Sequence, residues 1–517
     1  MLLAIIASIP FILLFILLIP LKRPAIKALP IVWFVALIIS YFVWNIELIY
    51  IPSSFLRAIF MALEIMLIVL GAVWLLEIVK QTKHIKNIED FLAAISPDSR
   101  IQGIIIGWLF VSLMEGVAGF GTPAAIAAPL LVALGFTPLL AVTVALIGNS
   151  VATTFGAAGT PILLGFGNLG FERTILEQSG HFSAIFHSIA SIVIPLSIVY
   201  LISSKKKGAF KEAIPFAIFT WFVFTVPYLL SALFLGPELP SILASLISLM
   251  IISFAARKEF LTPRKEFMLK KQKQKKIEPK KAIFSMLPYL IVVSLLMASR
   301  AIPELRSALQ SVSISWNNIL GSSTQFSYLP LFTPAFYFFV AIVISLFAFK
   351  TPYKIVKSSL MESFLKIKSA TIALIFALGF VQILIASSTN LRNIQSMPVV
   401  IAEALGNLFG NFYPFISPSI GALGSFISGS NTVSNILFGI FQSQSAVTLG
   451  ISIPIILALQ TVGGAVGNMI AIHNILAASA TVGLKNQESL IIKKTIVVML
   501  IYLLILGVLG MIAVRFF

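Results

Sequence analysis

Side chains that could bind a small organic anion gather in two Gly- and Pro-rich segments, residues 115–165 and 413–475. Glycine and proline are too dense in both for plain spanning helices, and each break frees backbone N–H groups at a half-helix N-terminus, which favour anions. The candidate substrate-binding residues are Gly121, Thr122, Asn149, Ser150, Thr153, Ser430, Asn431, Thr432, Asn435, Gln460, Thr461 and Asn468. Because neither segment contains Lys or Arg, a monocarboxylate is a better expected ligand than a di- or tricarboxylate.

Close helix packing is the alternative explanation for the glycines in these segments. Gly463 and Gly467 are four residues apart, the spacing that lets two helix backbones approach closely. Packing explains single glycines well, but it explains the paired clusters of polar residues and glycines less well.

Three ionisable residues in or beside apolar stretches are candidates for proton coupling: Glu64, Glu115 and His473. Ionisable groups are costly inside a membrane, so each is expected to have a function there. Glu64 lies in the middle of an apolar stretch, Glu115 opens the first broken segment, and His473 lies at the end of the second. A carboxyl group or an imidazole at these positions could carry a proton together with the substrate.

The elements that must hold these residues are membrane-spanning helices. Of the 517 residues, 59% are hydrophobic and only 10% are charged, where a soluble domain has about a quarter charged residues. Apolar stretches of about 20 residues, the length that spans a bilayer as a helix, recur along the whole chain. The sequence therefore predicts an all-α polytopic membrane protein with about 12 spans plus re-entrant elements.

The basic residues predict the orientation of these spans. Thirty of the 36 Lys and Arg residues fall in alternate loops that can all be placed in the cytoplasm, as the positive-inside rule requires. This places both termini outside, and it explains the net charge of +18 without nucleic acid as a partner. The expected location is the plasma membrane, with the lipid bilayer as the surrounding solvent.

The two broken segments also indicate an internal repeat. Gly119, Thr122 and Ile126 match Gly429, Thr432 and Ile436 at an offset of 310 residues. The predicted topology makes the two halves antiparallel, and such inverted-topology repeats with a broken or re-entrant helix in each half are typical of secondary transporters. The predicted domains are a first repeat (1–203), two connecting spans (204–256), a basic cytoplasmic linker (257–283) and a second repeat (284–517).

Several other classes of protein fit the sequence less well. The chain has no cysteine, and the spans contain neither a nucleophile–base pair nor a cluster of metal ligands, so we expect no enzyme, no metal and no cofactor. A passive channel would need a continuous polar pore, whereas the polar residues here cluster at two breaks.

The segments GFGTPAAIAAPLLVALGFTP and GNSVATTFGAAGTP in the first half, with LGSFISGSNTVSNILF and QTVGGAVGNMIAIHNILAASATVGL in the second, resemble the lactate permease family over the whole length. The resemblance implies a secondary active transporter that imports L-lactate, or glycolate or D-lactate, by proton symport and alternating access. Where the family has charged residues, this chain has Asn431 and Asn468. A sodium-coupled or exchange carrier for another small organic anion therefore stays open, as does a homo-oligomeric assembly.

Overall fold

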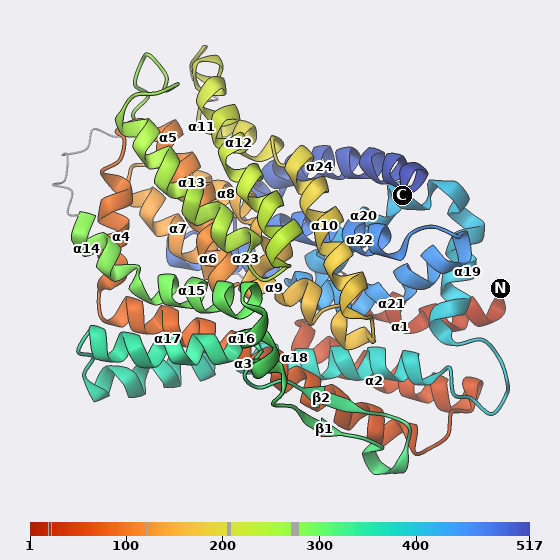
Figure 1. Cartoon of the computed structure of the whole chain (residues 1–517). Coiled ribbons are helices and arrows are strands. Elements are labelled where there is room, and N and C mark those ends of the chain that lie inside the picture. Colours follow the sequence, from red (N-terminus) through yellow and green to blue (C-terminus); the bar gives the residue numbers. More distant parts are fainter. Residues whose placement is uncertain (19, 22, 120–121, 204–207, 270–278) are drawn as a thin grey trace.

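The structure is a computed structural model that describes residues 1–517 except 19, 22, 120–121, 204–207 and 270–278, and this part of the chain is mostly helical (Figure 1). Among the described residues, ten helices are long and apolar enough to span a membrane, or up to 12 if each of two bent pairs counts as one span. One bent pair, Pro138–Asn149 with Ala152–Leu169, lies in the first Gly- and Pro-rich segment. The predicted all-α polytopic membrane fold is confirmed.

The helices before residue 204 are α1 (Leu2–Leu18), α2 (Ala25–Ile39), α3 (Tyr50–Gln81), α4 (His84–Ala93), α5 (Ser99–Ile104), α6 (Val111–Val117), α7 (Thr122–Ala133), α8 (Pro138–Asn149), α9 (Gly156–Leu163), α10 (Arg173–Ala190) and α11 (Val193–Ser203). The next two are α12 (Ala209–Leu235) and α13 (Pro240–Arg257). The remaining helices are α14 (Pro279–Ser285), α15 (Leu287–Ala301), α16 (Pro303–Gln310), α17 (Pro334–Ala348), α18 (Tyr353–Ala386), α19 (Met397–Phe409), α20 (Tyr413–Ser428), α21 (Asn431–Leu449), α22 (Ile453–Gly467), α23 (Ile472–Thr481) and α24 (Glu488–Phe516). A hairpin of two short antiparallel strands, β1 (Ile314–Trp316) and β2 (Phe326–Tyr328), lies between α16 and α17.

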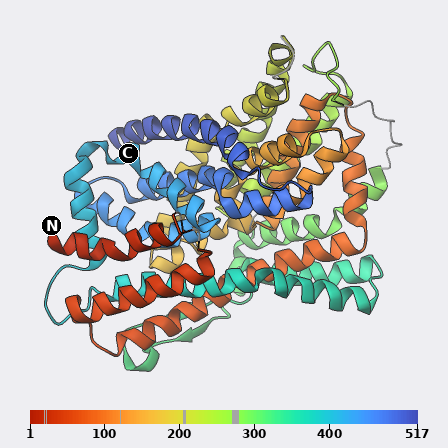
Figure 2. The same cartoon turned by 180° about the vertical axis from the view of Figure 1, so that it is seen from behind.

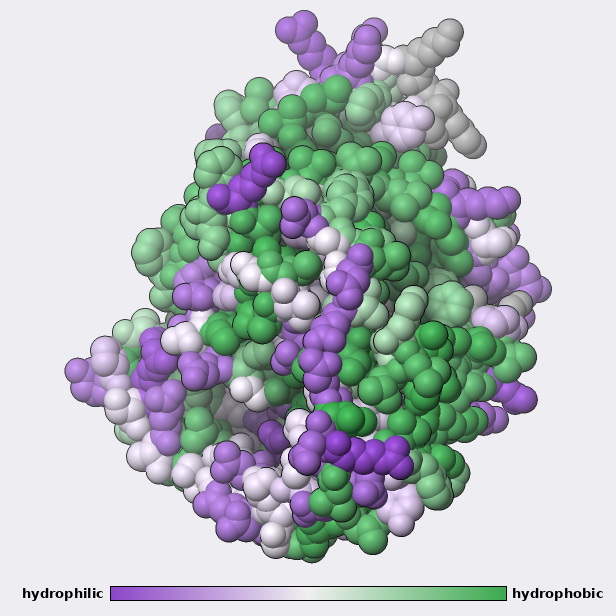
Figure 3. Space-filling model, turned by 90° about the vertical axis from the view of Figure 1, so that its right-hand side faces the viewer, coloured by the Kyte–Doolittle hydropathy of each residue, from purple (hydrophilic) through white to green (hydrophobic). Residues whose placement is uncertain are grey.

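Different parts of the chain lie at the two ends of the molecule. Both termini lie toward one end, and α4 and α14 lie toward the opposite end (Figures 1 and 2). The predicted topology, with the termini on one side of the membrane and the basic linker on the other, stays a prediction. Seen from the end with the termini, hydrophobic side chains cover much of the surface and hydrophilic ones gather toward the lower part of the view (Figure 3).

The two longest helices, α3 and α18, pack side by side and antiparallel. Arg57 donates to Gln382 at one end of the pair (3.0 Å), and Ser358 donates to Gln81 at the other (2.6 Å). These helices come from corresponding places in the two predicted repeats, because each is the long helix that precedes the Gly- and Pro-rich segment. Their opposite directions agree with an inverted arrangement of the two halves.

Glycines allow very close packing of parallel helices within each half. A Cβ atom on Gly148 of α8 would lie only 1.7 Å from the carbonyl oxygen of Gly107, in the π-helical turn Ile105–Phe110 between α5 and α6. A Cβ atom on Gly463 of α22 would lie 2.0 Å from the carbonyl oxygen of Pro418 in α20. Many glycines of these segments therefore do serve helix packing. Their packing and the binding role of the polar residues beside them are compatible.

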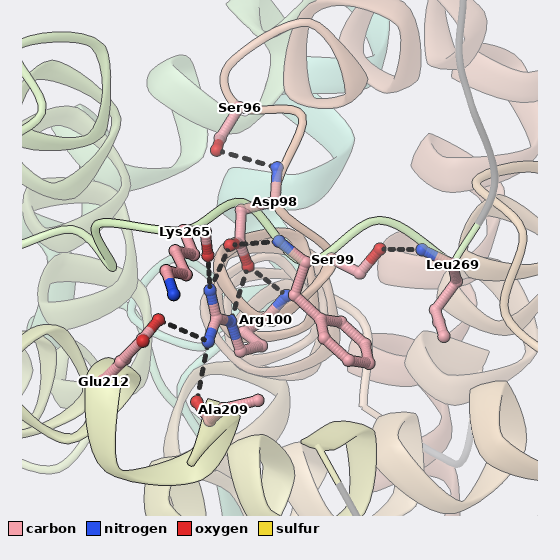
Figure 4. A network of polar contacts seen from close by, with 9 residues as sticks. Ser96, Asp98, Ser99, Arg100, Ala209, Glu212, Lys265 and Leu269 are labelled. Carbon is pink, nitrogen blue, oxygen red and sulfur yellow. Dashed lines mark hydrogen bonds and ion pairs between the residues drawn. The ribbon is translucent and has the colours of Figure 1, made fainter. Parts of the chain in front are cut away.

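A buried ion pair anchors the chain beyond α13. Arg100 (1% exposed side chain) bonds to Asp98 (2.6 Å) and to the carbonyl oxygens of Ala209 and Lys265 (Figure 4). Asp98 also accepts from the backbone N–H of Phe267. Because both buried charges are paired and hydrogen-bonded, this network holds residues 265–269 against the start of α5.

Candidate functional site

The first break lies between α8 and the body of α9. Its backbone has a left-handed conformation that residues other than glycine rarely adopt. A 3₁₀ turn (Ala152–Phe155) follows α8, and then Ala157, Ala158 and Gly159 all have positive φ angles of 43°, 52° and 80°. A left-handed conformation costs a non-glycine residue about 1–2 kcal/mol. Such strain persists only where the surroundings impose it, and it is commonest at functional sites.

The second break lies between α20 and α21 and uses ordinary helix-end chemistry. Gly429 (φ 73°) ends α20, and Ser430 caps α21 by accepting from the backbone N–H of Val433 (3.4 Å). The half-helix start predicted at Ser430–Thr432 is therefore present, with first-turn N–H groups able to face an anion. In the first half, α7 begins at Thr122 as predicted, while Gly121 and the side chain of Thr122 lie outside the described residues.

The two breaks meet in one partly open pocket, which we call the central pocket. Its empty volume is about 310 Å³. It is lined by Glu115, Gly119, Thr153, Gly156, Ala157, Thr160 and Pro161 from the first half and by Gly429, Ser430, Asn431, Thr432 and Asn468 from the second. Five predicted binding residues and the carboxyl group of Glu115 are thus brought together across about 350 residues of sequence. None of the lining residues is Lys or Arg.

The carboxyl group of Glu115 is fixed against the strained turn. Glu115 is only 3% exposed, and a Cβ atom added to Gly156 would lie 2.6 Å from its Oε1 atom. The side chain of Asn149 lies beside this carboxyl group and contacts Thr153, its Nδ2 being 3.3 Å from Thr153 Oγ1. The pocket therefore has one acid, held by the backbone of the first break.

Amide groups tie the second break together and connect it to the first. Asn431 donates to the carbonyl and hydroxyl oxygens of Thr461 (3.0 and 3.1 Å). Asn435 donates to the hydroxyl of Thr461 (2.8 Å) and to the carbonyl oxygen of Pro161 in the first half (2.9 Å). Asn468 accepts from Asn474 (2.6 Å).

Several buried oxygens around the pocket have no hydrogen-bond partner within the described part of the chain. They are Glu115 Oε2, Asn149 Oδ1, Asn431 Oδ1 and Asn435 Oδ1. A buried polar group left unpaired costs about 1–3 kcal/mol. Such oxygens can accept from a ligand hydroxyl or contact a cation. No group of three or more His, Asp or Glu residues that could hold a metal ion was found among the described residues.

Other predicted binding residues support the site without lining the central pocket. Ser150 donates to the carbonyl oxygen of Ile147 in its own helix (2.7 Å). Gln460 belongs to a buried chain in which it donates to Ser434 and accepts from Gln442. Asn149, Asn435 and Thr461 hold lining residues through the bonds given above.

Two larger cavities border the central pocket on different sides. The first, called the Lys366 cavity, has an empty volume of about 1570 Å³ and shares Gly429, Ser430 and Thr432 with the pocket. The second, called the Arg300 cavity, has an empty volume of about 640 Å³ and shares Thr160.

The three candidates for proton coupling lie in these three different spaces. Glu64 lines the Arg300 cavity, Glu115 lines the central pocket, and His473 lines the Lys366 cavity. The structure therefore does not bring them into one cluster. It places one of the three candidates in each of three adjoining spaces.

A charge cluster that the sequence did not predict lines the Arg300 cavity. The carboxylate of Glu238, in the turn between α12 and α13, contacts Arg300 (3.0 Å) and Arg173 (3.2 Å) through the same Oε1 atom. Burial acts to raise the pKa of Glu238, but the two arginines outweigh it and hold the pKa below its usual value. The charge pattern could have pointed to this cluster. Arg173 and Arg300 are two of the six basic residues that it places outside.

Comparison with known proteins identifies the family. The model of the family described as L-lactate permease matches residues 3–517. The chain belongs to the L-lactate permease family. The resemblance inferred from its motifs is thereby confirmed, and the family implies a multi-pass membrane transporter of a small organic anion.

Individual proteins show how far the similarity extends. A putative L-lactate permease of Haemophilus influenzae is 35% identical, covering 93% of this chain and 92% of its own. The glycolate permease of Escherichia coli is 27% identical, and the match covers 85% of this chain and 83% of that protein. Among solved structures, the YdaH transporter of Alcanivorax borkumensis covers 87% of this chain and 85% of its own, with 14% identity and a TM-score of 0.43.

Proposed function

We propose that this permease imports L-lactate, with glycolate or D-lactate as further substrates, by proton symport and alternating access. The observation that carries the proposal is the central pocket, where the acid of one break and the half-helix start of the other face the same space. Family membership supports lactate as the substrate.

The pocket chemistry suits a small 2-hydroxy acid. The first-turn N–H groups of α21, beginning at Asn431, can bind the carboxylate. The unpaired oxygens of Glu115 and Asn431 can accept from the hydroxyl group of lactate.

Proton coupling follows from the charges in the pocket. The lining has no Lys or Arg, so an ionised Glu115 would repel a bound carboxylate. Protonation of Glu115 removes this repulsion and supplies a donor to the carboxylate. The anion and the proton therefore bind best together, which is the thermodynamic basis of symport. Glu64 and His473 would exchange the proton with the two adjoining cavities.

The cavities support alternating access around this pocket. The larger Lys366 cavity includes residues near Lys366 and Ala25, which the charge pattern places toward the cytoplasm. On the opposite side, the Arg173–Glu238–Arg300 bridge joins α10, the α12–α13 turn and α15. We infer a state that is more open toward the cytoplasm.

The same proposal includes the domain organisation and orientation. Two inverted repeats, 1–203 and 284–517, would face each other across the pocket, joined by the connecting spans 204–256 and the cytoplasmic linker 257–283. The antiparallel packing of α3 and α18 supports the inversion. The termini would lie outside the plasma membrane.

A sodium-coupled or exchange carrier is the second candidate. The unpaired oxygens of Asn149, Asn431 and Asn435 favour it, because sodium prefers oxygen ligands and needs no titratable group. In this case the carboxyl group of Glu115 would serve as a further cation ligand.

Uptake into proteoliposomes separates these candidates. Labelled L-lactate should accumulate against its gradient when an inward proton gradient is imposed without sodium, and a protonophore should abolish the accumulation. Uptake that requires sodium and ignores the proton gradient would favour the second candidate. Absence of uptake under both ions would exclude lactate as the substrate.

A further inference from the structure

We propose that the Arg300 cavity contains a second, peripheral carboxylate-binding site centred on Arg173, which the substrate occupies before it reaches the central pocket. This inference rests on the proposed function and adds a site to it. It gives a role to the cluster of Arg173, Glu238 and Arg300, which has no part in the proposed binding of substrate and proton in the central pocket.

The cavity adjoins the central pocket. Thr160 lines both spaces, and Ala158, in the strained turn, lines the Arg300 cavity. A carboxylate that moves from water into a low-dielectric passage loses its hydration, and a guanidinium group offsets that loss. Among the described residues, the lining of the central pocket has no Lys or Arg, whereas the adjoining Arg300 cavity has two guanidinium groups.

Arg300 itself is already fully engaged. Its side chain is 5% exposed, and its three nitrogens bond to Glu238, to Ser299 and to the carbonyl oxygen of Phe332. Its guanidinium carbon also lies 3.7 Å from the centre of the Phe332 ring. Arg300 therefore positions Glu238 and holds α15 in place.

Arg173 differs from Arg300 in exposure and in bonding. Its side chain is 36% exposed, so solvent and small solutes reach it. Its Nε atom donates to Glu177 (2.8 Å) and its Nη2 atom to Glu238 (3.2 Å), and no hydrogen bond joins its Nη1 atom to another described residue. An incoming carboxylate can bind this open edge of the guanidinium group.

The shared carboxylate of Glu238 makes the exchange reversible. Glu238 contacts both arginines through Oε1, and it keeps Arg300 as a partner when a substrate carboxylate takes its place on Arg173. Without substrate, Arg173 is paired with Glu177 and Glu238, and a substrate carboxylate must compete with them. The site therefore binds the anion weakly and can release it toward Thr160. A stronger site would trap the substrate in the cavity.

Uptake kinetics give the first test. Arg173→Gln should raise the KM for external lactate about 10-fold, the loss expected for one charge-assisted hydrogen bond, and should leave Vmax within about 2-fold. Arg173→Lys, which keeps the charge, should restore KM to within about 3-fold of the native value. Arg392→Gln is the matched control, because Arg392 is an exposed arginine on the same predicted side and lines none of the three cavities. An unchanged KM in Arg173→Gln would overturn the proposal.

Thiol labelling gives a second test that does not need transport. The chain has no cysteine, so Leu164→Cys places a single thiol on the wall of the Arg300 cavity. Lactate should slow its alkylation by a membrane-impermeant maleimide, and this protection should persist when Asn431→Ala weakens lactate binding in the central pocket. Protection should be lost when Arg173→Gln is added, and protection that survives this change would overturn the peripheral site.

The two tests separate the peripheral site from the proposed function. Protection through Arg173 in a protein that takes up no lactate would leave the site standing and remove the proposed function. Normal uptake with no effect of Arg173→Gln on KM or protection would leave the function standing and remove the site. If Arg173→Gln does not fold, Arg173→Lys in the labelling assay should still show protection, and its absence would count against the site.

Discussion

The two breaks that meet in the central pocket have different chemistry, and they do not occupy matching places in the predicted repeat, because Gly429 matches Gly119 rather than the turn at Ala157. The first has a strained backbone at Ala157 and Ala158, and the carboxyl group of Glu115, from α6, lies against it. The second has no acid in the pocket, and it begins its half-helix with an unstrained cap at Gly429 and Ser430. One break is thus suited to carrying a proton and the other to binding an anion.

This difference separates the two proposed events, proton binding and anion binding, between two parts of the chain. Proton binding is assigned to the carboxyl group at the first break and anion binding to the second, and the proposed transport cycle requires both. Removing the acid should abolish coupling and leave exchange, whereas weakening the second break should reduce affinity. The following variants separate the two breaks by these signatures.

Glu115→Gln should have the largest effect. Accumulation driven by a proton gradient should fall at least about 100-fold, the scale of losing an essential protonation event, while lactate–lactate exchange across the membrane should persist. Exchange counterflow and gradient-driven uptake, measured on the same proteoliposomes, check this. Glu64→Gln is the matched control, and it should retain some coupled uptake because Glu64 lies outside the pocket. Intact coupling in Glu115→Gln would assign the proton to another group.

Asn431→Ala should have the next largest effect. It removes two hydrogen bonds to Thr461 at the start of α21, so the apparent affinity for lactate should fall about 10-fold or more. Coupling to protons should be kept, since Glu115 is untouched. Ser150→Ala, which removes only a bond within its own helix, should change lactate affinity by less than about 2-fold. Loss of coupling with unchanged affinity in Asn431→Ala would reverse the roles of the two breaks.

Gly156→Ala tests the support of Glu115 by a steric change. The backbone at Gly156 (φ −65°, ψ 154°) suits alanine, so the added methyl group acts only through its contact with Glu115. Overpacking should cost about 1–3 kcal/mol of stability and displace the carboxyl group, which reduces coupled uptake. Gly180→Ala, whose Cβ atom would meet nothing closer than 3.6 Å, should have little effect on either quantity. Equal behaviour of the two variants in uptake and thermal unfolding would contradict the proposed support.

Backbone strain should produce the smallest effects, with opposite signs at the two breaks. Ala158→Gly relieves a left-handed alanine and should raise stability by up to about 1 kcal/mol. Gly429→Ala introduces the same strain, and its Cβ atom would also lie 3.1 Å from that of His473, so stability should fall by about 1 kcal/mol or more. Thermal unfolding in detergent measures both. A loss of stability in Ala158→Gly would mean that the turn is not strained.

Much of this site could be predicted because composition and helix breaks are local properties of the sequence. Apolar length predicts the spans, and Gly, Pro and polar residues together predict where they break. That is why Thr153, Ser430, Asn431, Thr432 and Asn468 were candidates before the structure placed them around one pocket with Glu115.

The remaining features depend on packing between distant elements. Gln460 is a polar residue in a broken segment, just like Asn431, and only the structure shows that it bonds to Ser434 and Gln442 away from the pocket. The bridge of Glu238 with Arg173 and Arg300 joins three loops or helix ends that no sequence period connects. The left-handed angles at Ala157 and Ala158 are contrary to residue preference, so no local rule predicts them.

Proton uptake on lactate binding tests the central claim most directly. Isothermal titration of the purified protein with L-lactate, in buffers of different ionisation enthalpy, counts the protons that enter with the anion. The account predicts about one proton per lactate for the native chain and none for Glu115→Gln, which should still bind lactate through the second break. Lactate binding with no proton uptake by the native chain, or with the same uptake in Glu115→Gln, would contradict the assignment of the two breaks.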